Sequence, residues 1–188
     1  RQLREVLDAE WGTGWQRRFS AFEVRPVAAA SIGQVHRART RDGRPLAVKV
    51  QYPGIRRSID SDVANLGAML RYSGLLPPGL EIAPLLEAAR VQLHEEADYR
   101  AEGARMRAYA GLLAADPAFL VPGLAEDLTT ANVLAMDYAE GTDLDALITA
   151  PQAERDRVVQ SLLELAFREM FAFGMMQTDP NLANYRHA

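Results

Sequence analysis

The spacing of apolar residues along the chain predicts several amphipathic helices. Hydrophobic side chains recur every three to four positions, which places them on one face of a helix. The helices predicted in this way cover residues 1–12, 56–74, 81–115 (as one long helix or two joined helices) and a segment after Pro151 that ends near Gly174. A shorter helix is expected between Leu144 and Pro151. The apolar stripe of the last helix is expected to consist of Val158, Leu162, Leu165, Phe167 and Met170.

Short apolar runs between these helices predict strands. The runs are Val35–Arg39, Leu46–Val50, Phe119–Pro122 and Val133–Tyr138. Asp42-Gly43 lies between the first two runs and is typical of a β-hairpin turn. Trp15, Phe19 and Phe22 have the three-to-four spacing of core residues, which favours packing over a platform for stacking a ligand.

A stretch of small side chains precedes the predicted hairpin. Ala28-Ala29-Ala30-Ser31-Ile32-Gly33-Gln34-Val35 is predicted to be a loop. Small side chains let backbone N–H groups approach phosphate oxygens closely. The loop is therefore a candidate phosphate-binding segment.

Lys49 is the single lysine of the chain. The 21 basic residues otherwise consist of arginine, and Lys49 lies inside the apolar run Leu46–Val50. A lysine ammonium is a compact, strongly hydrated point charge, whereas a guanidinium is a wide planar fork. A lysine kept at one strand position of an arginine-rich chain indicates a residue that binds phosphate.

Composition narrows the classes of function. The chain is 48% hydrophobic and 24% charged, which is typical of a globular protein and not of a disordered one. The lack of cysteine excludes disulfides, thiolate catalysis and cysteine-ligated zinc, but leaves the compartment open. The basic residues are not interleaved with aromatic ones, so nucleic-acid binding is not expected. No run of 18 apolar residues occurs, so no membrane-spanning segment is expected within residues 1–188.

Charge is distributed unevenly along the chain. Residues 1–60 hold twelve basic and six acidic side chains, a net charge of +6, and the remainder carries −10. This division fits a basic lobe that handles phosphates beside an acidic lobe, and solvated faces would produce a similar one.

An acidic cluster lies in the middle of the helical segment over 81–115. Asp98 and Glu102 are spaced i,i+4, so two like charges would share one helix face at a modest cost. A solvated acidic face with Glu96 paired to Arg100 is one explanation. The strand lysine favours another, in which a helix carboxylate pairs with Lys49 and holds its ammonium within reach of phosphates, as in protein kinases.

The segment after Gly174 contains a second candidate site. Thr178-Asp179-Pro180-Asn181 has turn-forming residues and is compatible with a simple loop. Asp179 and Asn184 are also five residues apart. This is the spacing of a kinase catalytic loop, in which an Asp lies by the acceptor and an Asn five residues later binds Mg²⁺.

Taken together, these motifs resemble the UbiB/AarF family of atypical protein-kinase-like ATPases, which is linked to ubiquinone and other isoprenoid-lipid pathways. The resemblance covers nearly all of the chain and rests on four segments in order: AAASIGQVH at 28–36, LAVKVQYPG at 46–54, EADYRAEG at 96–103 and QTDPNLAN at 177–184. It implies an α+β, protein-kinase-like two-lobed fold. Residues 1–136 would form a small lobe with an antiparallel sheet and a helical insertion at 56–80, and residues 137–188 the hinge and the start of a mostly helical lobe.

The resemblance also implies roles for individual residues. Lys49 would contact the phosphates with Glu102 as its partner, Asp179 would be the catalytic-loop aspartate, and Asn184 would bind Mg²⁺. Other residues would contact the nucleotide: Ala28, Ala29, Ala30, Ser31 and Gly33 in the alanine-rich loop, and Met136, Asp137 and Ala139 at the adenine-contacting hinge. Glu96 and Asp98 match the E-x-D signature of the family.

Two family motifs do not occur in the sequence. The K-x-G-Q segment, which the E-x-D pair would face, and the D-F-G motif, whose Asp binds Mg²⁺, are expected outside residues 1–188. The chain is therefore interpreted as incomplete at both ends and, without D-F-G, as inactive on its own. Asp-Pro-Asn at 179–181 stands where protein kinases usually have His-Arg-Asp, as is normal for the family.

The function expected from the resemblance is an ATPase or phosphotransferase that binds ATP or ADP with Mg²⁺ and supports ubiquinone or isoprenoid-lipid metabolism. Its partners would be the nucleotide and an isoprenoid lipid, a quinone precursor or biosynthetic proteins. A cytoplasmic location is expected, with membrane contact only through segments outside residues 1–188. Three alternatives stay open: a pseudokinase scaffold that binds nucleotide without turnover, a small-molecule phosphotransferase of the aminoglycoside type, and a non-catalytic helical interaction module.

Overall fold

The computed structural model describes residues 2–73, 77, 80–177 and 181–188. The chain divides into two compact units. Unit 1 consists of Arg1–Met106 and Gly123–Asp137, and unit 2 of Arg107–Pro122 and Tyr138–Ala188. Each unit is described by itself below.

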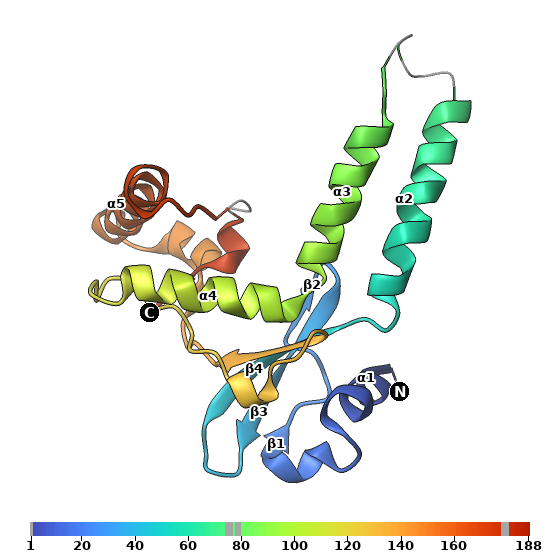
Figure 1. Ribbon diagram of the computed structural model, residues 1–188. Coiled ribbons are helices and arrows are strands. Elements are labelled where there is room, and N and C mark those ends of the chain that lie inside the picture. Colours follow the sequence, from blue (N-terminus) through green and yellow to red (C-terminus); the bar gives the residue numbers. More distant parts are fainter. Residues whose placement is uncertain (1, 74–76, 78–79, 178–180) are drawn as a thin grey trace. The chain divides into compact units, whose positions relative to one another are not determined.

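Unit 1 is built on an antiparallel sheet of five strands (Figure 1). The strands are β1 (Phe19–Phe22), β2 (Ala28–Ala30), β3 (Gly33–Thr40), β4 (Pro45–Gln51) and β5 (Val133–Asp137). Their order is β1-β3-β4-β5, and β2 also pairs with β3. The strands predicted over 35–39, 46–50 and 133–138 are therefore confirmed, as is the turn at Asp42-Gly43, where Gly43 has φ +93° and donates its N–H to the Thr40 carbonyl.

The two faces of β4 have different roles because side chains alternate along a strand. Leu46, Val48 and Val50 are almost completely buried on one face. Ala47 and Lys49 consequently lie on the other face. β4 thus contributes every second side chain to the core, and the side chains between them lie on the opposite face of the sheet.

Helix α1 (Gln2–Trp11) and the 3₁₀ helix η1 (Trp15–Arg18) supply the rest of this core. Leu7, Trp15 and Phe19 pack with the buried residues of β4 and β5, and Phe22 is partly buried against them. The aromatic rings meet edge to face, with ring centroids 4.9 Å apart for Trp15 and Phe22. The prediction that Trp15, Phe19 and Phe22 form core is confirmed.

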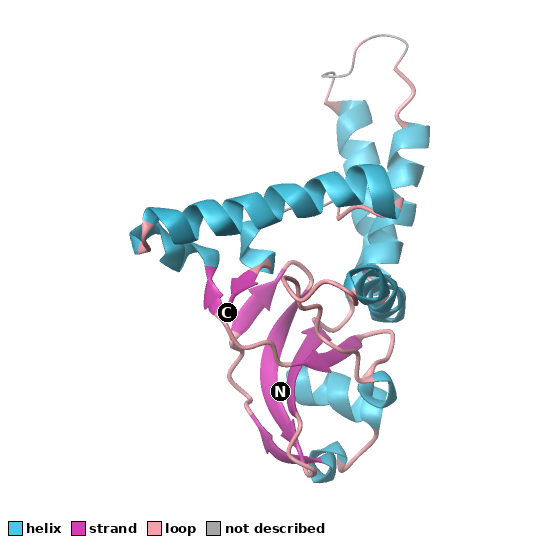
Figure 2. Ribbon diagram, turned by 90° about the vertical axis from the view of Figure 1, so that its left-hand side faces the viewer, coloured by secondary structure: helices cyan, strands magenta, loops and turns pink. Residues whose placement is uncertain are grey.

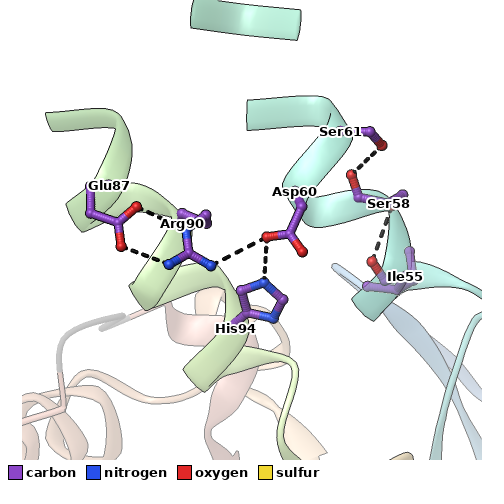
Figure 3. A network of polar contacts seen from close by, with 7 residues as sticks. All are labelled: Ile55, Ser58, Asp60, Ser61, Glu87, Arg90 and His94. Carbon is purple, nitrogen blue, oxygen red and sulfur yellow. Dashed lines mark hydrogen bonds and ion pairs between the residues drawn. The ribbon is translucent and has the colours of Figure 1, made fainter. Parts of the chain in front are cut away.

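Helices α2 (Ile55–Tyr72) and α3 (Ala83–Glu96) form a hairpin that extends away from the sheet (Figures 1 and 2). Gly67 allows the two helices to pack closely, because a Cβ there would meet the Leu86 side chain at 2.6 Å. A polar network also joins the two helices: Asp60 accepts from Arg90 at 3.4 Å and contacts His94 Nε2 at 2.9 Å (Figure 3). The helix predicted over 56–74 is confirmed.

The helical segment over 81–115 is two helices, because the chain breaks at Ala97-Asp98 between α3 and α4 (Tyr99–Leu113). The expectation that Asp98 and Glu102 repel each other within one helix is therefore wrong. The Asp98 carboxylate accepts the Arg100 N–H at 3.0 Å, and its carbonyl accepts the Glu102 N–H at 3.1 Å. Asp98 thus caps α4, and both carboxylates lie at a helix N-terminus, where negative charge is favourable.

The strand predicted over Phe119–Pro122 is not formed. Pro122 has no N–H to donate to a neighbouring strand, and Leu120 is 81% exposed. The nearest pairing is a single antiparallel bridge between Leu124 and Met136 of β5.

Unit 2 is mostly helical over its described residues. Its elements are the end of α4 from Arg107, the 3₁₀ helix η3 (Leu144–Thr149), helix α5 (Gln152–Arg168), the π-helical turn η4 (Glu169–Phe173), the 3₁₀ helix η5 (Leu182–Asn184), and the short strand pair β6 (Thr142–Asp143) and β7 (Arg186–His187). Gly174, with φ +63°, follows the π turn, which confirms the predicted helix end.

The buried face of α5 differs from the predicted stripe at its C-terminal end. Leu165 and Glu169 are buried, whereas Phe167 and Met170 are 59% and 58% exposed. Phe167 lies two positions after Leu165, so it points to the opposite side of a 3.6-residue helix. The prediction that Phe167 and Met170 belong to the buried stripe is therefore wrong. None of the helices in the described ranges is both long enough and apolar enough to cross a membrane.

Gly33 provides a test of how closely β3 and β4 approach each other. A Cβ at this position would overlap the backbone carbonyl of Val50. We expect Gly33→Ala to lower the free energy of unfolding by about 1–3 kcal/mol, the usual cost of overpacking. Gly111→Ala in α4 is the matched control: a Cβ there has no neighbour within 4 Å, so the substitution should stabilise the helix by up to about 1 kcal/mol. Equal urea midpoints for the two variants would contradict this account.

We expect His36 to make the stability of the protein depend on pH. Its ring is fully buried, its Nδ1 lies 2.9 Å from the Glu23 carbonyl, and burial lowers its pKa because the charged ring is poorly solvated there. The unfolded chain therefore binds a proton more readily, and stability that is complete above about pH 6.5 is lost as the pH falls below it. Urea denaturation at pH 7.5 and 5.5 should show this loss. His36→Asn, which keeps an N–H donor but does not titrate, should reduce it; an unchanged pH dependence would exclude His36 as its source.

Candidate functional site

The Lys49 side chain forms an ion pair with Glu102 of α4. Its Nζ donates to Glu102 Oε1 at 2.9 Å and to Oε2 at 3.2 Å. The two side chains are 21% and 36% exposed, so the pair is only partly desolvated. The predicted pairing of the strand lysine with this helix carboxylate is confirmed, and both residues belong to unit 1.

Several contacts fix the start of α4 beside the sheet. The buried Gln51 side chain of β4 donates to the Ala97 carbonyl at 2.7 Å, and the Tyr99 N–H donates to the Ala131 carbonyl at 3.1 Å. A Cβ at Gly103 would lie 3.1 Å from the Leu124 side chain, so glycine allows the helix to pack closely on this part of unit 1. These contacts fix the axial position and the rotation of α4 and thereby place Glu102 beside Lys49.

Tyr99 also belongs to this site, although no sequence motif predicted it. It is completely buried, and the Lys49 Nζ lies 4.8 Å from the centroid of its ring, within the range of a cation–π contact. Burial, and then the charge of Glu102, raise the pKa of Tyr99, so its hydroxyl stays neutral. The available signal was its i,i+3 spacing from Glu102, which puts both side chains on one side of α4.

The alanine-rich segment is a β-hairpin and not a loop. Ala28–Ala30 form β2, paired with β3 so that Ala28 is opposite Val35 and Ala30 is opposite Gly33. Only Ser31 and Ile32 remain as the turn. The prediction of a loop over this whole segment was wrong because alanine keeps negative φ, and no non-glycine residue in the described ranges departs from that, so the three alanines continue the sheet.

One face of the sheet leads from this hairpin to the ion pair. Residues directly opposite each other in antiparallel strands share a face. Val35 is opposite Lys49, Met136 is opposite Ala47, and all four are partly buried. The face therefore places a small apolar surface next to the Lys49 ammonium, a chemical combination that suits a flat base joined to phosphates.

The remaining predicted residues lie in several places. Met136 and Asp137 end β5 in unit 1, and Ala139 belongs to unit 2. Glu96 is the last residue of α3, where it accepts from the Gln92 side chain at 3.4 Å. Asp179 falls outside the described residues, as do Thr178 and Pro180.

Asn184 ends η5 with an exposed side chain. Its amide oxygen is the kind of hard donor that Mg²⁺ accepts, and Mg²⁺ in phosphate-transferring sites usually has few protein ligands besides the phosphates. Within the described ranges, no three His, Asp or Glu side chains are grouped as a metal site. The chemistry of the Asn184 side chain is thus compatible with an Mg²⁺ ligand.

Comparison with known proteins places this geometry in a wider context. The family model of the ABC1 atypical kinase-like domain matches residues 1–187. The rat atypical kinase COQ8B, mitochondrial, is 46% identical over 184 residues, which are 98% of this chain and 35% of that protein. Atypical kinase COQ8, mitochondrial, of Saccharomyces cerevisiae is 42% identical over 185 residues, 98% of this chain and 37% of the relative.

A solved structure confirms the predicted fold. Rv3197 of Mycobacterium tuberculosis, solved in complex with erythromycin, superimposes with a TM-score of 0.84 at 34% identity. The match covers 98% of this chain and 47% of the other. The kinase-like α+β fold expected from the sequence is thereby confirmed, and the chain spans about a third of the length of the two curated relatives.

The contact between Tyr99 and Lys49 can be measured by a double-mutant cycle. Tyr99→Phe keeps the ring face and removes a buried hydroxyl that has no hydrogen-bond partner in the described residues, so it should be neutral or stabilising. Tyr99→Leu should destabilise the fold, and its cost should be smaller by about 0.5–1 kcal/mol when Lys49 is replaced by Met, because the cation–π contact is then already lost. Strict additivity of the two unfolding free energies would show that the ring and the ammonium do not interact.

Proposed function

The chain belongs to the ABC1 atypical kinase-like family, which confirms the resemblance to the UbiB/AarF proteins. We propose on this premise that the protein binds ATP or ADP with Mg²⁺ and acts as a kinase-like ATPase or phosphotransferase. The observation that carries this proposal is the Lys49–Glu102 ion pair beside the half-buried sheet face of Val35, Ala47 and Met136.

Lys49 is suited to hold phosphate oxygens. An ammonium has three N–H donors, and the two Glu102 oxygens at 2.9 and 3.2 Å account for at most two of them. At least one donor remains for a phosphate, while Glu102 and the Tyr99 ring fix the direction of the side chain. A positive charge held in place before the ligand arrives stabilises the charge that develops on transferred phosphate without further reorganisation.

The other roles follow from the family and are part of the proposal. Asp179 orients or deprotonates the attacking oxygen, and Asn184 supplies an oxygen ligand to Mg²⁺, which when bound neutralises phosphate charge. Backbone groups of Ala28–Gly33 and of Met136–Ala139 contact the nucleotide. Glu96 and Asp98 form the E-x-D signature, for which the Asp98 cap of α4 gives a local role as well.

The biological setting is proposed from the same kinship. We place the protein in ubiquinone or isoprenoid-lipid metabolism, with a lipid, a quinone precursor or a biosynthetic protein as partner. The curated relatives named above are described as mitochondrial, and for this chain a cytoplasmic location, with membrane contact through segments outside residues 1–188, stays a prediction.

Lys49 is tested by two substitutions in the full-length protein. Saturating Mg-ATP at a hundred times its Kd should raise the stability of the wild type by about 2.7 kcal/mol in a thermal shift measurement. Lys49→Met removes the charge, and Lys49→Arg keeps it in a wider, planar group, so both should lose most of the stabilisation. Arg18→Lys, in an exposed ion pair with Asp127, is the control and should behave as the wild type. Equal stabilisation of wild type and Lys49→Arg would contradict a phosphate-binding role for this lysine.

Turnover separates the alternatives. An ATPase or phosphotransferase should hydrolyse or transfer phosphate, and Asp179→Asn should abolish this while leaving nucleotide binding. A pseudokinase scaffold should bind nucleotide without turnover, and a helical interaction module should not bind Mg-nucleotide. A small-molecule phosphotransferase should phosphorylate members of a substrate panel, in which erythromycin is included because Rv3197 was solved with it.

A further inference from the structure

We propose that Arg44 is a positioning residue for recognition of the nucleotide base, because it fixes Asp137 and thereby the end of β5 that would contact adenine. The inference rests on the proposed function and adds a residue that the motifs do not contain. It depends on three segments of unit 1, namely the turn before β4, Gly123 and the end of β5.

The ion pair itself is short and joins residues far apart in sequence. Arg44 Nε donates to Asp137 Oδ1 at 2.6 Å, across 93 residues. The side chains are 40% and 44% exposed. An ion pair this exposed usually contributes little to stability. The role that we assign to this ion pair is therefore to hold Asp137 in one position.

Hydrogen bonds within the turn hold the main chain of Arg44 independently of its side chain. The Arg44 N–H donates to Thr40 Oγ1 at 3.0 Å, and the Arg44 carbonyl accepts the Thr40 N–H at 3.0 Å. Gly43, with φ +93°, completes this tight turn. Because the backbone is already ordered, only side-chain freedom is lost when the guanidinium binds Asp137.

Asp137 is held on its other side by Gly123. The Asp137 N–H donates to the Gly123 carbonyl at 2.8 Å. A Cβ at Gly123 would overlap Asp137 Oδ2 and lie 4.0 Å from Arg44 Nη2. The carboxylate thus occupies space that only glycine leaves open, so both the main chain and the side chain of Asp137 are fixed.

Charge supports the pairing. The hydrogen bond that Arg44 donates to Asp137 is the main cause that raises the pKa of Arg44, and the nearby carboxylates of Asp127 and Asp42 add to it. The guanidinium therefore lies in a locally acidic part of the surface and keeps its charge at any pH at which the protein is folded.

The location of the pair favours positioning over direct contact with a ligand. Asp137 is opposite Leu46, whose side chain is buried in the core, whereas the preceding Met136 is opposite Ala47 on the Lys49 face. Arg44 therefore fixes the strand end from the face away from Lys49. A base on the Lys49 face would hydrogen-bond to the backbone at the end of β5, which the Arg44–Asp137 pair fixes from the opposite face. Small displacements of these backbone groups would lower the affinity for the base.

The experiment compares a ligand with a base and one without. Full-length wild type and Arg44→Ala are titrated calorimetrically with Mg-ATP and with magnesium triphosphate. We expect Arg44→Ala to weaken ATP binding roughly three- to tenfold and to change triphosphate binding by less than about twofold, because the triphosphate has no base to position. Asp137→Asn should have a similar effect, and the double variant should lose little more than either single one.

Arg18→Ala is the matched control, since Arg18 pairs with Asp127 at 3.2 Å in the same unit and is equally exposed at 41%. It should leave both affinities unchanged. Equal loss of ATP and triphosphate affinity in Arg44→Ala would assign the pair a purely structural role and overturn the inference, as would wild-type affinity for ATP. If the wild type binds neither ligand, the proposed function itself fails, which is a distinguishable outcome.

Discussion

The ion pair between Lys49 and Glu102 is a geometric constraint that both the sheet and helix α4 of unit 1 must satisfy. A shift of one residue in the pairing of β4 would turn Lys49 into the core and expose Val48, because the strand period is two. A shift of one residue in the start of α4 would rotate Glu102 by about 100° around the helix axis. The core contacts of Leu46, Val48 and Val50 prevent the first change, and the Asp98 cap with the close packing at Gly103 prevents the second.

A contribution to stability does not explain why several contacts fix the geometry of the Lys49–Glu102 pair. Taking two charges partly out of water has a desolvation cost that their attraction roughly offsets, so such pairs contribute little net free energy. What the surroundings add is direction: two carboxylate oxygens and the face of Tyr99 restrict the ammonium on several sides. A fixed direction of the ammonium is useful if the remaining Lys49 N–H donor binds a ligand.

Periodicity in the sequence predicted most elements of the fold, since alternating and 3.6-residue patterns record which face is buried. Over 81–115 it left one long helix or two joined helices open, and the Asp98 cap decides in favour of two. The prediction from small residues failed at 28–30, where the alanines extend the sheet and do not form a loop. Charge usage and motif order identified Lys49 and Glu102. Tyr99 and Arg44 were missed because their contacts join positions that only the folded chain brings together, 50 and 93 residues apart.

One strand organises both ends of the proposed ligand. Arg44 immediately precedes β4 and Lys49 lies within it, five residues later, or about 16 Å along an extended strand. The guanidinium lies on the core side and binds a carboxylate, where its donor fork is useful, and the ammonium lies on the other side, where a point charge suits phosphate. Because one strand holds both groups, the proposed sites for base and phosphates would be fixed relative to each other by covalent geometry and sheet pairing within unit 1. In this proposal Arg44 and Lys49 each lie where the shape of their charge suits the group that they bind.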